Sequence, residues 1–475
     1  MGCYDRGMAI VSGRERRAFR RGEEVALTID RMAYGGRGVG RVDGFVVFVP
    51  DTAPGDRVRA RLWRIKPGYA EADLVAVESP GEARAAPPCP FFGPCGGCVW
   101  QHLNYAAQLA AKEHIVRESL AHLAGLHDLE IRPILPMAEP WGYRNKMEFT
   151  FHPSALLGLH RRGAFDQVVP IDACLVQSAA ANAILHSVRD WAAASGLSRY
   201  DPRDRTGLLR QVIIREASST GEVLVGLITT APEVPAAQAL AGLLIGSVPK
   251  VAGVLHGINP GLSDGLPLHG VALLAGRHYI VEELAGVRFR IGLETFFQTN
   301  TAQAGRLIEV VEALAGLGGG ETVYDLYCGV GTFSLPLARR AKQVLGVEIV
   351  PSAVQAAREN AASNGISNAE FLTGDARRQL PDLVRRAGRP DVLVLDPPRS
   401  GAGRRVTEKI IAAGAARIVY VSCNPTTLAP DLSELVRAGY IVRAVQPVDM
   451  FPQTYHVECV VLLSSAPDGG RSRAA

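Results

Sequence analysis

Three side chains in the C-terminal third of the sequence have types and positions suited to covalent catalysis. Cys423 follows the apolar run 417–422 and precedes Asn-Pro, Asp396 ends the run 391–396 before Pro-Pro-Arg, and Glu458 begins the last apolar stretch. A cysteine thiolate is a nucleophile, and a carboxylate serves as a general base. Most lone cysteines are packing residues, but Cys423 stands at the end of an expected strand, facing a cleft. The set predicts a covalent bond to a carbon atom followed by removal of a proton.

A second group of residues suits a nucleoside cofactor. The stretch 325–332 (DLYCGVGT) places two glycines after an apolar run, where the backbone can approach a ligand closely. Glu348 lies 23 residues after Asp325 and is positioned to accept hydrogen bonds from ribose hydroxyls, while Asp375 can contact an adenine amino group. The dinucleotide pattern G-x-G-x-x-G is not satisfied. The residues therefore favour S-adenosylmethionine over a nicotinamide dinucleotide.

Regular alternation of strands and helices from residue 304 onward predicts the scaffold for these residues. Such alternation is typical of a parallel, doubly wound α/β sheet with helices on both faces. The expected elements are helix 304–317, strand 322–327, a helix, strand 343–349, helix 352–364, strands 370–374 and 391–396, helix 404–414, strand 417–422, helix 427–439, and strands 441–449 and 456–464. The last strand is expected to be antiparallel, because only a short loop precedes it. The carboxyl ends of the strands then bring catalytic and cofactor residues into one pocket.

A thiolate, a carboxylate and a methyl donor together suit methylation of uracil at carbon 5. That carbon is a poor nucleophile toward a methyl sulfonium, but thiolate addition at carbon 6 makes the ring an enolate. The C5 proton must then leave so that the thiolate can be eliminated, which needs a base. Cys423 fits the nucleophile and Glu458 the base, while Asp396 can hold the uracil edge or the cofactor.

Several ordered motifs resemble the bacterial RNA (uracil-5-)-methyltransferases, and most closely the 23S ribosomal RNA members. The motifs are FFQTN (296–300), DLYCGVGTF (325–333), LDPPRSGA (395–402), VYVSCNPTTLAPDL (419–432) and DMFPQTYHVE (449–458). The resemblance implies a class I (Rossmann-like) methyltransferase domain and the covalent mechanism above. Cys423 matches the family nucleophile and Glu458 the base. Family positions that bind the cofactor or the target base are matched by Gln298, Tyr327, Glu348 and Asp396, and by Thr332 and Asp375 where members vary.

Four cysteines in the first half of the chain suit a metal centre. Cys89, Cys95 and Cys98 are close in sequence and Cys174 is remote, and four thiolates suit iron–sulfur or zinc. Structural zinc sites usually pair two short Cys-x2–4-Cys knuckles, and the Cys-x3-Cys-x2-Cys spacing of radical S-adenosylmethionine enzymes is absent. The resemblance implies that these cysteines ligate a [4Fe–4S] cluster with a structural or RNA-shaping role.

The N-terminal region predicts a small barrel that binds RNA. Short glycine-punctuated strands over 23–79 are typical of an OB-like barrel, and 16–79 resembles the TRAM domain. Residues 1–66 carry 14 Lys and Arg against 8 Asp and Glu, in a chain whose net charge is +4. Such a surplus suits a polyanion, although a solvated basic face without a ligand explains it equally well.

Length and composition indicate a multidomain globular protein. The chain has 475 residues, of which 47% are hydrophobic and 21% charged, and the sequence shows no secretory signal or membrane span. The expected domains are the barrel at 16–79, a central α+β domain with the cluster at 80–295, the methyltransferase domain at 296–465, and a disordered tail at 466–475. We expect a cytoplasmic monomer that binds neither DNA nor membrane.

Four alternatives compete with a ribosomal uridine methyltransferase. A cytosine-5 RNA methyltransferase would place Pro-Cys in the loop that here reads Asp-Pro-Pro, and an amino-methyltransferase would need no thiolate. A non-catalytic iron–sulfur RNA-binding or ribosome assembly protein would not need the intact site. The tRNA branch of the family lacks the barrel and the cluster cysteines.

Several conspicuous residues carry weaker interpretations. Packing is the favoured role for Cys328 and Cys459, and Cys3 falls in an expected disordered leader. His456 is expected to orient the loop that carries Glu458. The stretch 141–149 (WGYRNKMEF) either stacks on a splayed RNA base or forms an exposed strand.

Overall fold

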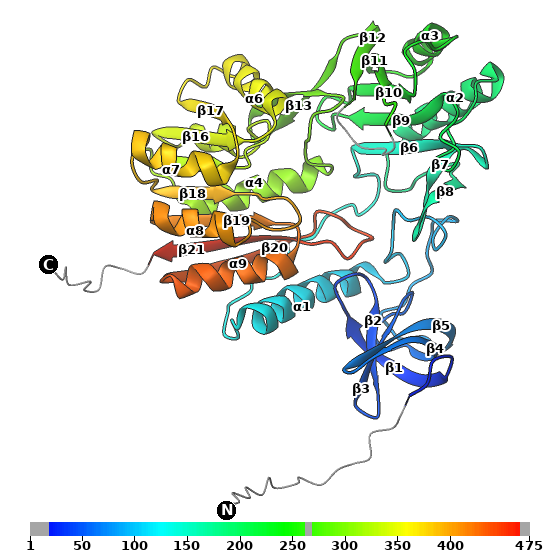
Figure 1. Cartoon of the computed structure of the whole chain (residues 1–475), viewed down its shortest axis with the longest axis horizontal. Coiled ribbons are helices and arrows are strands. Elements are labelled where there is room, and N and C mark those ends of the chain that lie inside the picture. The colour runs from blue at the N-terminus through cyan, green and yellow to red at the C-terminus, as the bar shows by residue number, and fades with distance from the viewer. Residues whose placement is uncertain (1–18, 262–267, 466–475) are drawn as a thin grey trace, which may run out of the picture. The chain divides into compact units, whose positions relative to one another are not determined.

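The computed structural model describes residues 19–261 and 268–465 (Figure 1). Cys3 and the expected tail at 466–475 lie outside the described residues. The chain divides into two compact units, one made of residues up to Ala86 with His102–Ala107, and the other of Pro87–Gln101 with the chain from Gln108 onward. This division does not test the predicted domain boundaries at 79/80 and 295/296, which stay predictions. None of the helices in the described ranges has the length and apolar character needed to cross a membrane.

The first unit contains a closed five-stranded barrel. Its strands follow the order β1-β2-β3-β5-β4, and β3 and β5 are its parallel pair. Alternate residues of β1 and β4 are buried, as expected for a sheet that faces its own core on one side. The strands are β1 (Glu24–Met32), β2 (Gly38–Val42), β3 (Phe45–Val49), β4 (Arg57–Lys66) and β5 (Tyr69–Ser79). The predicted small barrel is therefore confirmed.

A seven-stranded sheet forms the centre of the second unit, in the order β12-β11-β10-β9-β6-β7-β8. β10 and β11 are parallel, and the other neighbours are antiparallel. Its strands are β6 (Lys146–His152), β7 (Ala155–Arg161), β8 (Ala164–Pro170), β9 (Leu209–Glu216), β10 (Val223–Thr229), β11 (Val251–Ile258) and β12 (Gly270–Gly276). Helices α2 (Ala179–Ser195) and α3 (Ala237–Ser247) pack on it. A short hairpin, β13 (Tyr279–Leu284) and β14 (Val287–Gly292), follows.

A second seven-stranded sheet carries the predicted site, in the order β17-β16-β15-β18-β19-β21-β20. The pairs from β17 to β19 are parallel, and β21 is antiparallel to both of its neighbours. Its strands are β15 (Thr322–Leu326), β16 (Gln343–Glu348), β17 (Ala369–Thr373), β18 (Val392–Leu395), β19 (Arg417–Ser422), β20 (Tyr440–Val448) and β21 (Glu458–Ser465). The predicted α/β sheet with an antiparallel last strand is confirmed.

Helices flank this sheet, and one of them was not expected. They are α4 (Thr301–Ala315), α5 (Ser334–Ala338), α6 (Pro351–Ser363), α7 (Ala376–Ala387), α8 (Arg404–Ala413) and α9 (Pro425–Arg437), while α1 (Tyr105–Ala124) contributes Val116 and Leu120 to the same core. The sequence interpretation ran strand 370–374 directly into strand 391–396, but α7 lies between them. Pro381 inside α7 and its many arginines hid the helical pattern.

Candidate functional site

The predicted nucleophile and base lie next to each other at the carboxyl edge of the second sheet. Ser422, the last residue of β19, pairs with Cys459 of the antiparallel strand β21. One step further along both strands, Cys423 comes opposite Glu458. Asn424 then caps α9 by accepting a hydrogen bond from the Thr426 amide at 3.0 Å, which fixes the chain directly after the thiol. The register thus brings together two residues that are 35 positions apart in the sequence.

The thiol and two carboxyl groups oppose one another's ionisation. Burial raises the pKa of Cys423 to about 11, and the nearby carboxyl groups of Glu458 and Asp396 act in the same direction. Glu458 is only 4% exposed, and burial together with Asp396 raises its pKa well above the ordinary value. Burial and then Asp325 raise the pKa of Asp396 to about 7. At neutral pH Cys423 and Glu458 therefore hold their protons and Asp396 is partly ionised, so the site carries little negative charge at rest.

Arg399 supplies positive charge to this cluster, and His456 contacts it. The guanidinium lowers the pKa of both Cys423 and Glu458, against the larger effect of burial. Its Nη2 lies 2.8 Å from the ring nitrogens of His456. Because arginine can only donate, the imidazole must accept and be neutral. Burial, followed by Arg399 and by Lys112 and Arg144, lowers the pKa of His456 to about 3. His456 thus orients Arg399 and is no proton source at neutral pH.

The glycine loop after β15 has the backbone shape of a ligand cradle. Gly329 and Gly331 have φ values of 54° and 88°, a region that favours glycine. A Cβ on Gly331 would lie 2.9 Å from Leu335 Cγ, so the loop packs closely on the start of α5. The Glu348 carboxylate accepts hydrogen bonds from the amides of Gly329 at 3.2 Å and Val350 at 2.9 Å. Glu348 therefore ties the end of β16 to this loop, and its expected contact with ribose hydroxyls stays a prediction.

Asp325, the buried carboxylate on β15, has one oxygen atom that accepts no hydrogen bond. One of its oxygens accepts a hydrogen bond from Ser334 Oγ at 2.5 Å, and the other, Oδ1, is buried without a partner. Burial raises the pKa of Asp325 to about 7. An unsatisfied buried acceptor is rare in folded proteins and fits a ligand that brings a donor or a positive charge, such as the ammonium group of S-adenosylmethionine. The sequence interpretation used Asp325 only to count the offset to Glu348.

A cavity of about 290 Å³ next to this loop suits an adenosine group. Tyr327, Ile349 and Asp375 line it, which combines an aromatic ring, an apolar side chain and an acid. Asp375 also caps α7 by accepting the Arg377 amide at 2.8 Å, so part of its hydrogen-bonding capacity is used. Gln298 and Thr332 stand outside the lining of this cavity. Gln298 is 9% exposed in the loop before α4, where its carbonyl accepts Asn145 Nδ2 at 3.0 Å.

The four predicted metal-binding cysteines line one cavity of about 490 Å³, so the fold brings the remote cysteine to the other three. The cysteines are Cys89, Cys95, Cys98 and Cys174. Burial raises the pKa of Cys98 to about 11 and that of Cys174 to about 12. Across the described ranges, no group of three or more His, Cys, Asp or Glu side chains is arranged to hold a metal ion. The four cysteines thus share a cavity, but they are not arranged in this structure to hold a metal ion.

Two aromatic residues of the stretch 141–149, Tyr143 and Phe149, form neither an exposed strand nor an open stacking platform. Tyr143 is 7% exposed and Phe149 is fully buried, and strand β6 begins only at Lys146. The Tyr143 hydroxyl donates a hydrogen bond to the carbonyl of Pro452 at 2.9 Å. Both expectations for the aromatic residues Tyr143 and Phe149 were therefore wrong, because these side chains point into the protein.

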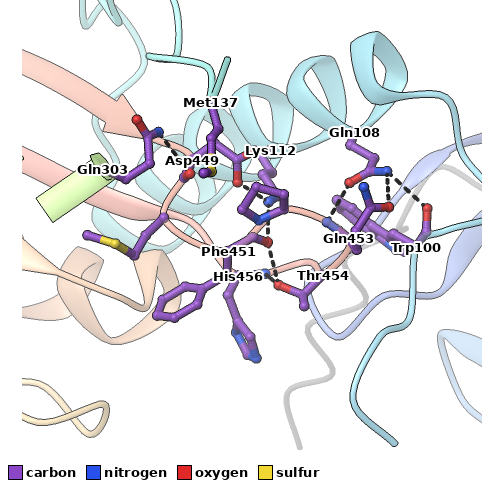
Figure 2. A network of polar contacts seen from close by, with 12 residues as sticks. Trp100, Gln108, Lys112, Met137, Gln303, Asp449, Phe451, Gln453, Thr454 and His456 are labelled. Carbon is purple, nitrogen blue, oxygen red and sulfur yellow. Dashed lines mark hydrogen bonds and ion pairs between the residues drawn. The ribbon is translucent and has the colours of Figure 1, made fainter. Parts of the chain in front are cut away.

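The loop 449–457, which leads into Glu458, is held by a polar network that sequence reasoning missed (Figure 2). Lys112 of α1 and Asp449 form a fully buried ion pair at 2.5 Å. Gln108, one helical turn earlier, exchanges hydrogen bonds with Gln453. A lysine and a glutamine on the buried face of a predicted helix were the available signal, since such residues are rarely buried without partners.

Comparisons with known proteins agree with this geometry. The family model described as tRNA (Uracil-5-)-methyltransferase matches residues 272–466, and the TRAM domain model matches residues 18–75. An uncharacterized RNA methyltransferase of Bacteroides thetaiotaomicron is 41% identical over 91% of this chain and 99% of its own length. Another, from Halalkalibacterium halodurans, is 36% identical over 92% of this chain and 96% of its own length.

A solved structure resembles most of the chain. It is the tRNA (uracil-54, C5)-methyltransferase of Pyrococcus abyssi in complex with S-adenosyl-L-homocysteine, with a TM-score of 0.74, 28% identity, and coverage of 92% of this chain and 99% of that chain. The barrel from Glu24 to Ser79 is 56 of 475 residues, more than the 8% left uncovered. Part of the barrel therefore has a counterpart in a tRNA enzyme, and the expectation that tRNA enzymes lack it was wrong.

Proposed function

This chain belongs to the RNA (uracil-5-)-methyltransferase family, and from that membership we propose that it methylates carbon 5 of a uridine in 23S ribosomal RNA. S-adenosylmethionine supplies the methyl group, Cys423 is the nucleophile and Glu458 is the base. The observation that carries the proposal is the β19–β21 register, which sets the thiol beside a buried carboxyl group. The proposal includes a cytoplasmic location and a monomeric enzyme.

Cys423 begins the reaction by losing its proton to solvent and forming a bond from Sγ to carbon 6 of uracil. The electron pair of the C5=C6 bond moves onto C5 and O4, which makes C5 nucleophilic. Arg399, held by the neutral His456 ring, offsets the negative charge that develops near Cys423. Protonated Glu458 keeps repulsion low while this charge forms.

S-adenosylmethionine, when bound, would provide an electrophilic methyl group to the activated C5 and leave as S-adenosylhomocysteine. Glu458 passes its own proton to the Asp396 carboxylate and then, ionised, takes the C5 proton. The C5=C6 bond reforms, and the Sγ–C6 bond breaks to return the Cys423 thiolate. The raised pKa of Glu458 makes its carboxylate a stronger base than an exposed glutamate.

The cofactor would be held by acids and by the glycine loop. Asp325 Oδ1 would accept from the ammonium group, Glu348 from the ribose, and Tyr327 and Asp375 would flank the adenine. Gln298, Thr332 and Asp396 are proposed to complete this binding set. All seven residues belong to the proposal, since no bound cofactor is part of the structure.

We propose further that Cys89, Cys95, Cys98 and Cys174 ligate a [4Fe–4S] cluster. Its contribution would be structural, cross-linking the segment before α1 to the segment after β8. Iron and acid-labile sulfide, measured in anaerobically purified protein, should fall to background in Cys174→Ser. The matched variant Cys459→Ser, a buried cysteine on β21, should retain both. Absence of iron from the unaltered protein would contradict the proposed cluster.

A covalent trap tests the chemistry. 5-Fluorouridine carries fluorine at C5 in place of the proton that the base must remove. RNA that contains it should therefore remain bound to the wild-type enzyme as a denaturation-resistant adduct. Cys423→Ala should abolish both the adduct and turnover, and the buried control Cys459→Ala should keep both. Glu458→Gln should accumulate methylated RNA attached to enzyme. Adduct with cytidine analogues would instead favour a cytosine-5 methyltransferase, and no adduct with any RNA would favour a non-catalytic RNA-binding protein.

Transfer RNA is the second candidate substrate, favoured by the likeness to the Pyrococcus abyssi enzyme. The ribosomal proposal rests on the cysteine pattern, because the barrel no longer separates the two branches. Mapping 5-methyluridine in 23S RNA and in tRNA from a strain lacking the gene distinguishes them. Loss from 23S RNA alone supports the proposal, and loss from tRNA alone replaces it with the second candidate.

A further inference from the structure

The loop 449–457 carries His456 and delivers Glu458, yet it contains no helix or strand. A general base must be held closely for proton transfer, so something must fix this loop. Its own internal contacts are few, such as the Thr454 hydroxyl donating to the Phe451 carbonyl at 2.8 Å. The loop is fixed mainly by groups from distant parts of the sequence.

The wall of the cysteine-lined cavity supplies one set of contacts. The amides of Val99 and Trp100, which directly follow Cys98, both donate to the carbonyl of Gln453 at 3.0 Å. Tyr143, which lines the same cavity, donates its hydroxyl to the carbonyl of Pro452 at 2.9 Å. Two consecutive carbonyls of the loop are therefore held by Tyr143, which lines the cavity, and by the two amides between Cys98 and Gln101, which also line it.

Helix α1 supplies the second set (Figure 2). Gln108 Nε2 donates to Gln453 Oε1 at 3.0 Å and to the Trp100 carbonyl at 3.2 Å, while its Oε1 accepts the Gln453 amide at 2.9 Å. Lys112 Nζ donates to the Phe451 carbonyl at 2.9 Å as well as to Asp449. Gln108 thus joins the cavity wall and the loop directly.

Gln453 shows that these contacts impose a conformation on the loop. Its φ is 67°, a left-handed conformation that costs a non-glycine residue about 1–3 kcal/mol when it is held there. The amide, the carbonyl and the side chain of Gln453 each have a partner from the cavity wall or from α1. The conformation is thus set from outside the loop, five residues before Glu458.

We propose that Tyr143 is a positioning residue for the general base: the wall of the cysteine-lined cavity, acting through Tyr143 and the Val99–Trp100 amides, sets where Glu458 stands. The inference rests on the proposed function, and it adds a role for the cavity wall in the second half of the reaction. Methyl transfer needs Cys423 and the cofactor, whereas release needs Glu458 in place. Loosening the loop should therefore slow release more than methyl transfer.

Tyr143→Phe removes the hydroxyl and keeps the ring. Its matched control is Tyr440→Phe, which removes a buried hydroxyl that donates to the Ala415 carbonyl at 2.9 Å, at the end of β20 remote from the loop. In single-turnover experiments with S-adenosylmethionine labelled on the methyl group, methylated RNA is separated into free and enzyme-bound fractions. We expect Tyr143→Phe to transfer methyl within about twofold of the wild-type rate, to release product at least tenfold more slowly, and to accumulate the methylated adduct. Tyr440→Phe should match the wild type.

Equal slowing of transfer and release in Tyr143→Phe, or no slowing of either, would overturn the inference. Amide hydrogen exchange gives a readout apart from activity: the 449–457 amides should exchange faster in Tyr143→Phe and not in the control. Should Tyr143→Phe fail to fold, Gln108→Met, which removes the hydrogen bonds to Gln453, tests the inference by the same rates and exchange measurements. Failure of the proposed function looks different, because the wild-type enzyme would then form no adduct with 5-fluorouridine RNA.

Discussion

Replacing Asp325 by asparagine should remove the pH dependence that this carboxyl group gives to the unfolding free energy. Burial raises the pKa of this carboxyl from its ordinary value of 3.8 to about 7. The folded chain therefore holds a proton at pH 5 that the unfolded chain has lost, and this contribution disappears as pH rises through 7. The sign is opposite to that of a salt-bridged carboxylate, which stabilises the fold at higher pH.

The magnitude follows from the two pKa values. Between pH 5 and pH 8 the wild-type chain should lose about 2.5 kcal/mol of unfolding free energy through Asp325 alone. The amide side chain of the variant cannot ionise, so Asp325→Asn should be stabilised relative to the wild type by about that amount more at pH 8 than at pH 5. The effect should also spread to Asp396, because Asp325 raises the pKa of that carboxyl. An amide donor left without an acceptor shifts the stability at both pH values equally and cancels in the comparison.

Urea unfolding of the full chain, followed by far-ultraviolet circular dichroism at pH 5, 6, 7 and 8, measures this difference. Asp128→Asn, at an exposed loop position, should track the wild type at every pH. Parallel loss of stability in Asp325→Asn and wild type between pH 5 and 8 would refute the reasoning. The same variant should bind S-adenosylhomocysteine more weakly, since Oδ1 is the acceptor left without a partner.

Three further predictions concern the thiol, the glycine loop and the buried ion pair. Because the pKa of Cys423 is about 11, the rate of adduct formation with 5-fluorouridine RNA should rise about tenfold per pH unit between 7 and 9; a flat profile would contradict a buried, protonated thiol. Gly331→Ala should lower stability by about 1–3 kcal/mol and weaken S-adenosylhomocysteine binding in calorimetry, since φ is 88° and the new Cβ would meet Leu335; unchanged melting would show that the loop can yield. Lys112→Met should cost about 3–5 kcal/mol in urea unfolding by removing the positive charge paired with the buried Asp449, and Lys112→Met with Asp449→Leu should recover most of it.

The methyltransferase sheet could be predicted because its pattern is local and repeated. Runs such as 322–327 and 417–422 are apolar, short and bounded by turn residues, and each coincides with a buried parallel strand. Helix α7 escaped because only Ala376, Leu380 and Leu383 of its twelve residues are buried and Pro381 interrupts the pattern. Its packing, rather than its composition, makes it a helix.

Some residues of the candidate site could likewise be predicted from the sequence, and others could not. Cys423 and Glu458 could be named from motifs at the ends of apolar runs, and the sheet order then determines that they meet. The role of Asp325 Oδ1 depends on the absence of a partner, which no sequence pattern records. The contact between Tyr143 and the Pro452 carbonyl spans 309 positions, and the topology of the central sheet had to be known before the side chain could be placed.

The position of β21 within the sheet also bears on how the protein matures during synthesis. This strand is the last of the sheet to be translated, yet it is inserted between β19 and β20, which precede it in the chain. Until it arrives, both of those strands present unpaired backbone edges, which are templates for misassociation. A polypeptide that ends before Glu458 would already contain the proposed nucleophile but not the proposed base. If the proposed mechanism holds, such a chain could form the covalent bond to RNA but could not break it, and insertion of the final strand completes the site that turns over.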